Sequence, residues 1–422
     1  MEIEKILRKI EKIIPKKIFR ATQPIYHYLL TLLGAIIYRF PARKLFIIGI
    51  TGTKGKSTTT EIVNAILEEA GYKTALSNTI RFKIDKDSKA NKYKMSMPGR
   101  FFMQKFLRQA VKNGCTHAVV EITSEGSKQF RHKFIWLDAF IFTNLAPEHI
   151  ESHGSYEKYR EAKLRIADNV KKKNGIVIVN GDDEESEMFL NRTNVTKKIK
   201  FSLTDAKPIR FGEKTEMRFK KNTLYSPLPG EFNVYNILAS ATLAEQIGIS
   251  DEIIKTAVEK LSEIPGRVQK VKVGQDFDVI VDYAHTAESL EELYKAFPNR
   301  RKICILGNTG GGRDKWKRPI MAKVAEKYCD EIILANEDPY DEDPFQIVQE
   351  MKDAISDSTK SVKIILDRRQ AISEAVKKAQ KNDIVLISGK GTDPYIMEAN
   401  GQKTPWSDFE IAKEEILKQI KK

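Results

Sequence analysis

The stretch GITGTKGKSTTTE, residues 49–61, decides how the chain folds. It follows an apolar run from Leu45 to Ile48 and precedes a helix-like run that begins at Ile62. A strand, a glycine turn and a helix in this order form a phosphate cradle, because backbone N–H groups and the positive helix N-terminus converge there. The common spacing G-x-x-x-x-G-K-[ST] is absent, since Ile50 stands five residues before Gly55. The stretch therefore predicts nucleotide binding through a shortened loop.

An alternation of apolar runs and amphipathic stretches begins at Leu45 and predicts an α/β protein with mostly parallel sheets. The apolar runs are 44–50, 117–123, 138–145 and 175–180, followed by 278–284, 302–308, 331–337, 362–367 and 383–389. A more polar stretch, 192–228, is expected to be antiparallel or loop-like. With a boundary near residues 262–266, we expect a central P-loop ATPase domain over 45–264 and a Rossmann-like C-terminal domain over 265–422.

Residues 1–44 are expected to form a helical, partly apolar segment. Apolar residues recur at helical spacing until Pro15, and a second apolar run, 25–38, is flanked by Lys and Arg. This run is shorter than the roughly 20 residues that a bilayer-spanning helix needs, and no cleavage site of a secretory signal follows it. Two interpretations stay open: a helix packed on the next domain or on a partner, and an interfacial helix on anionic lipid.

The composition narrows the class of partner. The 422 residues carry 72 Lys and Arg against 57 Asp and Glu, a formal charge of +15, which suits nucleic acid, anionic membranes or polyanionic small substrates. Zinc-finger spacing and basic-aromatic stripes are absent from the sequence, so no nucleic-acid partner is expected. Cys115, Cys304 and Cys329 lie too far apart in sequence to indicate a disulfide framework or a metal site, and are expected to be buried thiols in a reducing cytosol.

Several residues after predicted strands have the chemistry of a nucleotide site. Lys56 supplies a cation to phosphates, and Ser57 has the position of a hydroxyl bound to Mg²⁺. Glu121 ends the strand 117–123, where parallel sheets bind ligands, and a hard oxygen there suits Mg²⁺. The alternative for Glu121 is a salt bridge at a strand end.

A second cluster follows the strand 138–145. It contains Asn144, Glu148, His149, His153 and Lys163, although the whole chain has only six His. Two His beside a carboxylate indicate either ligand or phosphate contacts or ordinary structural histidines.

Eleven motifs, in order over residues 45–422, together resemble the Mur ligases, which are ATP-dependent amide-forming enzymes of peptidoglycan synthesis. Within that family the chain is most similar to the UDP-N-acetylmuramoyl-tripeptide synthetases. The motifs are GITGTKGKST, VEITSEGS, FTNLAPEHIESHGSYEKYREAK, VNGDDE, LPGEFNVYNILAS, IPGRVQ, VDYAHTAESL, GNTGGGRDKWKRPIMAKVA, NEDPYDEDP, SGKGTD and PWSD. The shortened loop is the family's own form, T-G-T-x-G-K-[ST].

The resemblance implies ATP and Mg²⁺, and a carboxylate that is phosphorylated to an acyl phosphate and then attacked by an amine. It implies that Lys56 holds the β and γ phosphates, that Ser57 and Glu121 hold one Mg²⁺, and that His149 lies near a second. It also implies that Lys163 is carbamylated and so becomes a metal ligand. The remaining nucleotide contacts that it implies are Gly52, Thr53, Lys54, Gly55, Thr58, Asn144, Asn236 near the adenine, Arg267 toward the C-terminal domain and Asp282 near the ribose. For Asn236 the alternative is a helix cap.

The chain departs from the family pattern in three places. Only 44 residues precede the ATPase domain, where the family carries a UDP-binding domain. The D-N-P-R motif reads Glu337, Asp338, Pro339, Tyr340, so the arginine that clamps a second carboxylate is missing. G-K-G-H-E reads GKGTD, in which Asp393 replaces a glutamate.

These departures predict how the amino acid binds. Asp338 and Asp393 are expected to take its ammonium group, and Arg313 or Arg318 its α-carboxylate. Because Tyr340 offers no cation, lysine or a small neutral amino acid is expected in preference to diaminopimelate.

The sequence therefore predicts an ADP-forming ligase that joins an amino acid to a carboxylate of a muramoyl-peptide acceptor. We expect it in the cytoplasm, with peripheral membrane contact through residues 1–40, and the oligomeric state stays open. The alternatives are a polyglutamate-type ligase, such as folylpolyglutamate synthase or a cyanophycin synthetase, and a non-catalytic Mur-type scaffold subunit.

Overall fold

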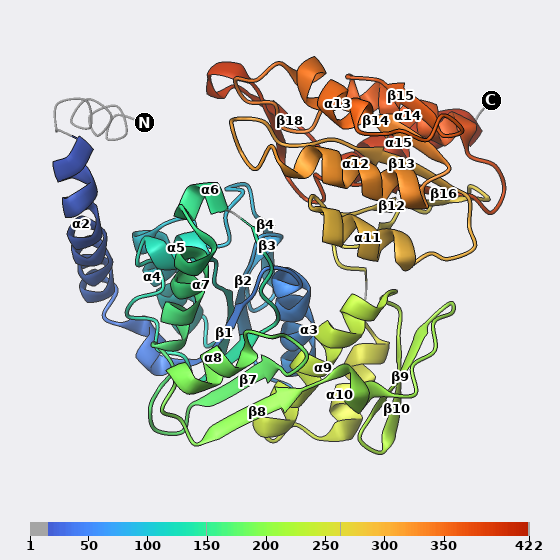
Figure 1. Cartoon of the computed structure of the whole chain (residues 1–422). Helices are drawn as coiled ribbons and strands as arrows, with labels where there is room; N and C mark the ends of the chain where they lie inside the picture. The colour runs from blue at the N-terminus through green and yellow to red at the C-terminus, as the bar shows by residue number, and fades with distance from the viewer. Residues whose placement is uncertain (1–15, 149, 262, 421–422) are drawn as a thin grey trace.

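The computed structural model describes residues 16–148, 150–261 and 263–420, with side chains from residue 22 onward (Figure 1). The predicted α/β class is confirmed: two mostly parallel sheets, each covered by helices on both faces, follow one another along the chain. The helix predicted before Pro15 lies outside the described residues.

The first sheet has eight strands within the described residues, in the order β4-β3-β2-β5-β1-β6-β7-β8. Its strands are β1 (Phe46–Thr51), β2 (Thr74–Ser77), β3 (Arg81–Ile84), β4 (Asp87–Ala90), β5 (His117–Glu121), β6 (Ala139–Phe142), β7 (Ile176–Asn180) and β8 (Lys197–Phe201). All neighbours are parallel except the pairs that β3 makes with β2 and β4. Because its central strands are buried on both faces, they read as continuous apolar runs, which is why β1, β5, β6 and β7 were predictable.

Two layers of helices cover this sheet. One face packs on α3 (Lys56–Glu69), α9 (Glu231–Gln246) and α10 (Asp251–Glu259). The other packs on α4 (Arg100–Lys112), α7 (Tyr156–Ala167) and α8 (Ser186–Arg192). The polar stretch 192–228 contains the antiparallel hairpin β9 (Thr215–Phe219) and β10 (Asn222–Ser226), as predicted, but also β8, which pairs in parallel with β7.

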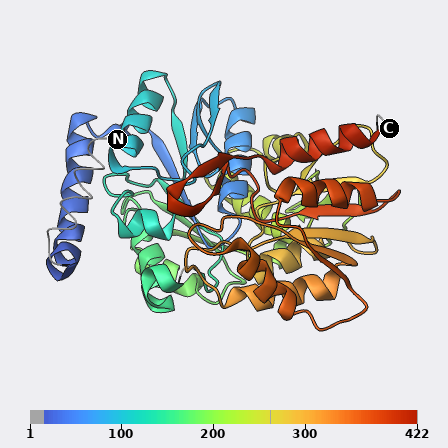
Figure 2. The same cartoon turned by 90° about the horizontal axis from the view of Figure 1, so that it is seen from above.

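The second sheet has six strands in the described part of the chain, in the order β11-β12-β16-β13-β14-β15. Its part of the chain is coloured from yellow to red in Figure 2. The strands are β11 (Gln269–Lys270), β12 (Asp278–Val281), β13 (Lys302–Leu306), β14 (Glu331–Leu334), β15 (Ser361–Ile364) and β16 (Ile384–Ile387). Its core helices are α11 (Ala287–Lys295), α12 (Lys317–Tyr328) and α13 (Pro344–Asp353) on one face, with α14 (Arg368–Lys378) and α15 (Asp408–Ile420) on the other. A hairpin, β17 (Tyr395–Met397) and β18 (Lys403–Pro405), follows β16.

The helix α2 (Lys16–Ile37) lies outside the helices that cover the first sheet and packs against α4 (Figure 1). Ala35 is buried there, and Thr31 Oγ1 donates a hydrogen bond to the carbonyl oxygen of Phe130. The helix also exposes an apolar stripe, which consists of Ile25, Tyr26, Tyr28, Leu29, Leu33, Ile36 and Ile37. No helix within the described residues is long and apolar enough to cross a bilayer.

The prediction of three buried thiols is wrong for two of the cysteines. Cys304 on β13 and Cys329 at the end of α12 form a disulfide, with Cα atoms 6.1 Å apart, while Cys115 is a buried free thiol. The parallel crossover through α12 returns the chain beside β13 and so brings together residues that are 25 positions apart. Spacing in the sequence does not show this proximity.

Candidate active site

A cleft of about 1420 Å³ lies between the two sheets and is lined by loops from both. The shortened glycine loop between β1 and α3 forms one end of it. Residues that follow β12, β13, β14 and β16 form the other. Carboxyl ends of parallel strands are where such sheets bind ligands, so both sheets present that edge to one cavity.

Two positions of the loop require glycine, because neighbouring side chains lie so close to the backbone that a Cβ atom would clash with them. Gly52 has φ +151° and Gly55 φ +79°, and a Cβ atom would lie 1.9 Å from Thr143 Oγ1 at the first and 2.3 Å from Asn236 Oδ1 at the second. Asn144 anchors the loop, since its Oδ1 accepts a hydrogen bond from the N–H of Lys54 at 2.8 Å. The loop is thus fixed with the N-terminus of α3 facing the cleft.

Glu121, at the end of β5, is the centre of a buried hydrogen-bond network. Its carboxylate accepts bonds from Ser57 Oγ at 2.7 Å, Ser96 Oγ at 2.7 Å and Thr79 Oγ1 at 2.9 Å. Burial alone would raise the pKa of Glu121, but Lys56 and these hydrogen bonds hold it below its ordinary value. The carboxylate is therefore kept ionised, and these contacts differ from the salt bridge that was the alternative. Ser96 and Thr79 were not predicted.

The donor set fits Mg²⁺. No group of three or more His, Cys, Asp or Glu side chains forms a metal site in the described residues. Mg²⁺ is characteristically bound by one or two carboxylates together with substrate phosphates, not by an all-protein cage. Glu121 and Ser57, beside the phosphate loop, offer that kind of partial site.

Lys163 on α7 is buried beneath the glycine loop. Its Nζ donates a hydrogen bond to the carbonyl oxygen of Gly52 and lies 4.9 Å from the centre of the Tyr159 ring. Burial, followed by the charge of Lys56, lowers the pKa of Lys163 well below its ordinary value. Lys56 itself lines the cleft and donates to the carbonyl oxygen of Thr53 at 2.7 Å.

The two predicted histidines differ in outcome. His149 lies outside the described residues. His153 is buried at the end of a short helix and packs edge-on against Tyr159, with Glu125 3.3 Å away. This packing agrees with the structural alternative for His153.

The residues predicted to contact the nucleoside line the same cleft, as does Thr58. Asn236 lies inside α9, whose N-cap is Gly230, so it is not the helix cap that was the alternative. Arg267 stacks over Tyr283 at 4.5 Å, and its Nη2 lies 3.4 Å from Ser57 Oγ. Both carboxylate oxygens of Asp282 accept backbone N–H bonds at 2.7 Å, which fix its orientation.

Polar contacts join the two sheets across the cleft. Lys54 Nζ lies 3.1 Å from Glu288 Oε2, and His285 Nε2 lies 3.1 Å from Glu148 Oε1. These contacts place the phosphate loop opposite the N-terminus of α11.

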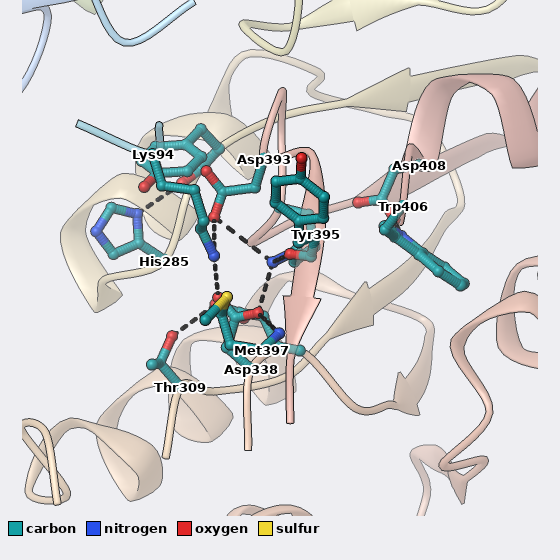
Figure 3. Close-up of polar contacts among 12 residues, drawn as sticks. Lys94, His285, Thr309, Asp338, Asp393, Tyr395, Met397, Trp406 and Asp408 are labelled. Atoms are coloured by element: carbon teal, nitrogen blue, oxygen red, sulfur yellow. Dashed lines mark hydrogen bonds and ion pairs between the residues drawn. The ribbon is translucent and has the colours of Figure 1, made fainter. Parts of the chain in front are cut away.

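At the far end of the cleft, Asp338 and Asp393 bind two lysines (Figure 3). Lys390 Nζ lies 2.7 Å from Asp338 Oδ1 and 3.5 Å from Asp393 Oδ2. Lys94 reaches them from the loop after β4 of the first sheet, at 2.7 Å from Asp338 Oδ2 and 2.9 Å from Asp393 Oδ2. Lys94 was not predicted as a site residue, because the sequence analysis assigned no strand or site to the segment that contains it.

The two arginines predicted as alternatives for the α-carboxylate lie in different places, and Arg318 needs correction. Arg318 does not line the cleft: it is buried, and its guanidinium binds Glu342 and Glu350 at 2.8 Å each. The other candidate, Arg313, lines the cleft, and its guanidinium stacks 4.9 Å above the ring of Tyr340.

Comparison with known proteins gives the family. Residues 50–244 match the model described as Mur ligase middle domain, and residues 266–391 match the one described as Mur ligase, glutamate ligase domain. A UDP-N-acetylmuramoyl-L-alanyl-D-glutamate--2,6-diaminopimelate ligase from Syntrophomonas wolfei subsp. wolfei is 32% identical over 414 residues, which cover 95% of this chain and 84% of the relative.

Solved structures agree. A UDP-N-acetylmuramoyl-L-alanyl-D-glutamate--2,6-diaminopimelate ligase has a TM-score of 0.61 at 29% identity, over 89% of this chain and 79% of that chain. A folylpolyglutamate synthase from Mycobacterium tuberculosis has a TM-score of 0.70 over 88% of this chain and 96% of that one, but at 13% identity it shows the fold alone. With the shortened phosphate loop at one end of the cleft, these matches show that the chain belongs to the Mur ligase family, whose members are ATP-dependent, ADP-forming amide ligases.

Proposed function

We propose that this chain forms an amide bond between a carboxylate of a muramoyl-peptide acceptor and an amino acid, with ATP converted to ADP and phosphate. The observation that supports the proposal is that one cleft has two kinds of binding group at its two ends. One end has the phosphate loop beside Glu121, and the other has two carboxylates, Asp338 and Asp393, that bind ammonium groups. We assign the first end to a domain over 45–264 and the second to a domain over 265–422.

The chemistry balances with these groups. The γ-phosphoryl group of ATP passes to a carboxylate oxygen and ADP leaves; the amine then attacks the acyl carbon, loses a proton, and phosphate leaves. Transfer between anions requires positioning and cations more than covalent chemistry by the protein. Mg²⁺, when bound, would neutralise phosphate charge beside Ser57 and Glu121.

The residues of this chain have separate roles in the proposal. Lys56 holds the β and γ phosphates, and Arg267 connects the phosphate end to the second sheet through its contact with Ser57. Asn236 and Asp282 contact adenine and ribose. Lys163, as a carbamate, would supply a negative metal ligand, and His149 is assigned a contact with a second cation.

We also propose that α2 holds the enzyme at the inner face of the membrane. Its exposed apolar stripe is followed by the exposed basic residues Arg39, Arg43 and Lys44. An amphipathic helix with basic neighbours binds anionic lipid through buried apolar area and charge together. Such a position suits an acceptor that is lipid-linked as well as one that is UDP-linked.

One experiment tests the function. ADP release is measured with a panel of amino acids against UDP-linked and lipid-linked muramoyl peptides, and it should require both substrates. ADP release that depends on glutamate and a folate would favour the polyglutamate-type alternative. No release with any pair would favour the scaffold alternative.

A further inference from the structure

Among the described residues, the carboxylates at the far end of the cleft outnumber the cations of the second sheet that contact them. Glu337, Asp338 and Asp393 all line the cleft, and Lys390, which is fully buried, contacts Asp338 and Asp393. Arg368 lies nearby but is bound to Asp408 through two hydrogen bonds. The site therefore needs a further cation, because buried carboxylates are stable only when paired.

Lys94 supplies that cation from the other domain (Figure 3). The two oxygens of Asp338 are used differently: Oδ1 accepts from Lys390 and from the N–H of Met397, while Oδ2 accepts from Lys94 alone among the described residues. Burial alone would lower the pKa of Lys94, but Asp393 and Asp338 raise it above its ordinary value, so the side chain is present as an ammonium ion.

A second carboxylate at this end has a buried oxygen that accepts no hydrogen bond from the described residues. Glu337 Oε1 accepts a hydrogen bond from Thr309 at 3.0 Å, but no described residue donates to the buried Oε2. Glu337 and Asp338 are adjacent in sequence and both line the cleft. The arrangement thus offers one ammonium position that Lys94 fills and one buried acceptor that is unused.

We propose that Lys94 occupies the position of the amino-acid substrate's ammonium group, so that the incoming amine must displace it from Asp338 and Asp393. This inference rests on the proposed function. A substrate ammonium restores the charge balance that Lys94 provides, which makes the exchange possible without leaving a buried carboxylate unpaired. Lys94 then sets the amine concentration at which the enzyme works, because a site that is free only part of the time binds its ligand more weakly by that fraction.

Displacement can be tested with Lys94→Met, Lys94→Arg and a matched control, Lys89→Met. Lys89 lies on β4, in the same segment, and is exposed with a surface contact to Asp87. Lys94→Met should lower the KM for the amine about tenfold, with the KM for ATP unchanged, since the competitor is removed. Lys94→Arg keeps a cation in the position and should retain a KM near that of the unmodified enzyme, as should Lys89→Met.

A second measurement needs no turnover and no variant. Lysines of the unmodified enzyme are acetylated briefly in the presence of L-lysine or meso-diaminopimelate and quantified by peptide mass spectrometry. The ratio of Lys94 to Lys89 labelling corrects for reagent consumed by the free amine. This ratio should rise several-fold at a saturating concentration of the amino acid that supports ADP release, because displaced Lys94 becomes accessible.

The outcomes separate the inference from the function on which it rests. If ADP release depends on the amine but the labelling ratio stays constant and Lys94→Met leaves its KM unchanged or raises it, Lys94 does not compete with the amine and the inference is wrong. If the unmodified enzyme releases no ADP with any amine and acceptor, the proposed function is rejected and the inference with it.

Discussion

Ser57 Oγ donates a hydrogen bond of 2.7 Å to Glu121 Oε2, although 64 positions separate the two residues in the sequence. The bond joins the first turn of α3 to the end of β5, so a hydroxyl and a carboxylate meet beside the phosphate loop. Their orientation is set before any ligand binds, because Thr79 and Ser96 hold the carboxylate from the other side. Preorganised groups of this kind cost little reorganisation during reaction.

Lys56→Ala should abolish amine-dependent ADP release. A phosphate-binding cation is lost where charge moves, which costs about 3 kcal/mol or more of transition-state stabilisation and at least a hundredfold in rate. Lys73→Ala, which removes a 58% exposed lysine paired with Asp85, is the control and should keep its activity. Near-native ADP release by Lys56→Ala, measured by a coupled assay, would contradict the assignment of this end of the cleft.

Several cleft residues that were not predicted from the sequence come from one segment of the chain. Strands buried on both faces, such as β1, β5, β13 and β16, are continuous apolar runs and were predicted. The segment 74–97 gave no such signal, because β3 and β4 are short, partly exposed and mostly polar. That segment brings Thr79, Lys94 and Ser96 into the cleft.

Tertiary geometry explains the other differences. Arg318 and Arg313 stand five positions apart in one glycine-rich motif, yet only the former lies on α12, where its buried guanidinium binds the partly exposed carboxylates of Glu342 and Glu350. The spacing of the two arginines in the motif does not determine where either side chain points. The lysine-rich β8 was not predicted because an edge strand needs apolar residues on only part of its surface.

Lys163 should carry a carbamate when bicarbonate is present. Only the neutral amine reacts with carbon dioxide, and burial, which lowers the pKa of Lys163 well below its ordinary value, increases the share of that form. Enzyme equilibrated with ¹³C-bicarbonate should therefore show a carbamate NMR signal that weakens as the pH falls, and Lys163→Arg should lack it. Lys171→Arg, at a half-buried lysine paired with Asp138, should keep it. A plain lysine in a crystal grown with bicarbonate, together with an active Lys163→Ala variant, would refute the assignment.

Arg318→Met should destabilise the fold without changing the KM for the amino acid. Removing the guanidinium leaves Glu342 and Glu350, which are 20% and 39% exposed, without their buried partner, at a cost of about 1 kcal/mol in the free energy of unfolding after solvent screening. Thermal unfolding of the variant and of the unmodified protein measures this difference.

The stability lost in Arg318→Met should depend on pH in one direction. Burial alone would raise the pKa of Glu342, but hydrogen bonds from Arg318, Gly312 and Lys315 lower it to about 2. A carboxylate with a lowered folded-state pKa adds stability that is full above its ordinary pKa of 4.5 and is lost as the pH falls toward 2. The difference in melting temperature should therefore be largest above about pH 5 and shrink below it. A constant difference from pH 7 to pH 3 would contradict this account.

Deleting residues 1–40 should remove binding to anionic vesicles. Co-sedimentation of the full chain should fall as salt rises, because charge attraction is screened while apolar burial is not. Leu29→Gln and Leu33→Gln, both on the exposed stripe, should each weaken binding roughly tenfold. Tyr72→Gln, an exposed apolar residue away from α2, is the control and should bind as the unmodified protein does. A full chain that ignores vesicles at low salt would leave the packing of α2 on α4 as its role.

Arg313 and Tyr340 should together decide which amino acid is used. The guanidinium of Arg313 stacks on Tyr340, and Arg313 lines the cleft. Arg313→Gln should therefore raise the KM for the amino acid by about 10- to 100-fold, which corresponds to the loss of a hydrogen bond between charged groups. Lys323→Ala, at an exposed lysine on α12, should leave the KM unchanged. If Arg313 binds the α-carboxylate, Tyr340 offers no cation to a second carboxylate, and lysine or a small neutral amino acid should be preferred. Tyr340→Arg would then add the missing guanidinium and raise kcat/KM for diaminopimelate relative to lysine by tenfold or more. An unmodified enzyme that prefers diaminopimelate would instead assign Arg313 to the second carboxylate, and in that case Arg313→Gln should lose diaminopimelate while retaining lysine.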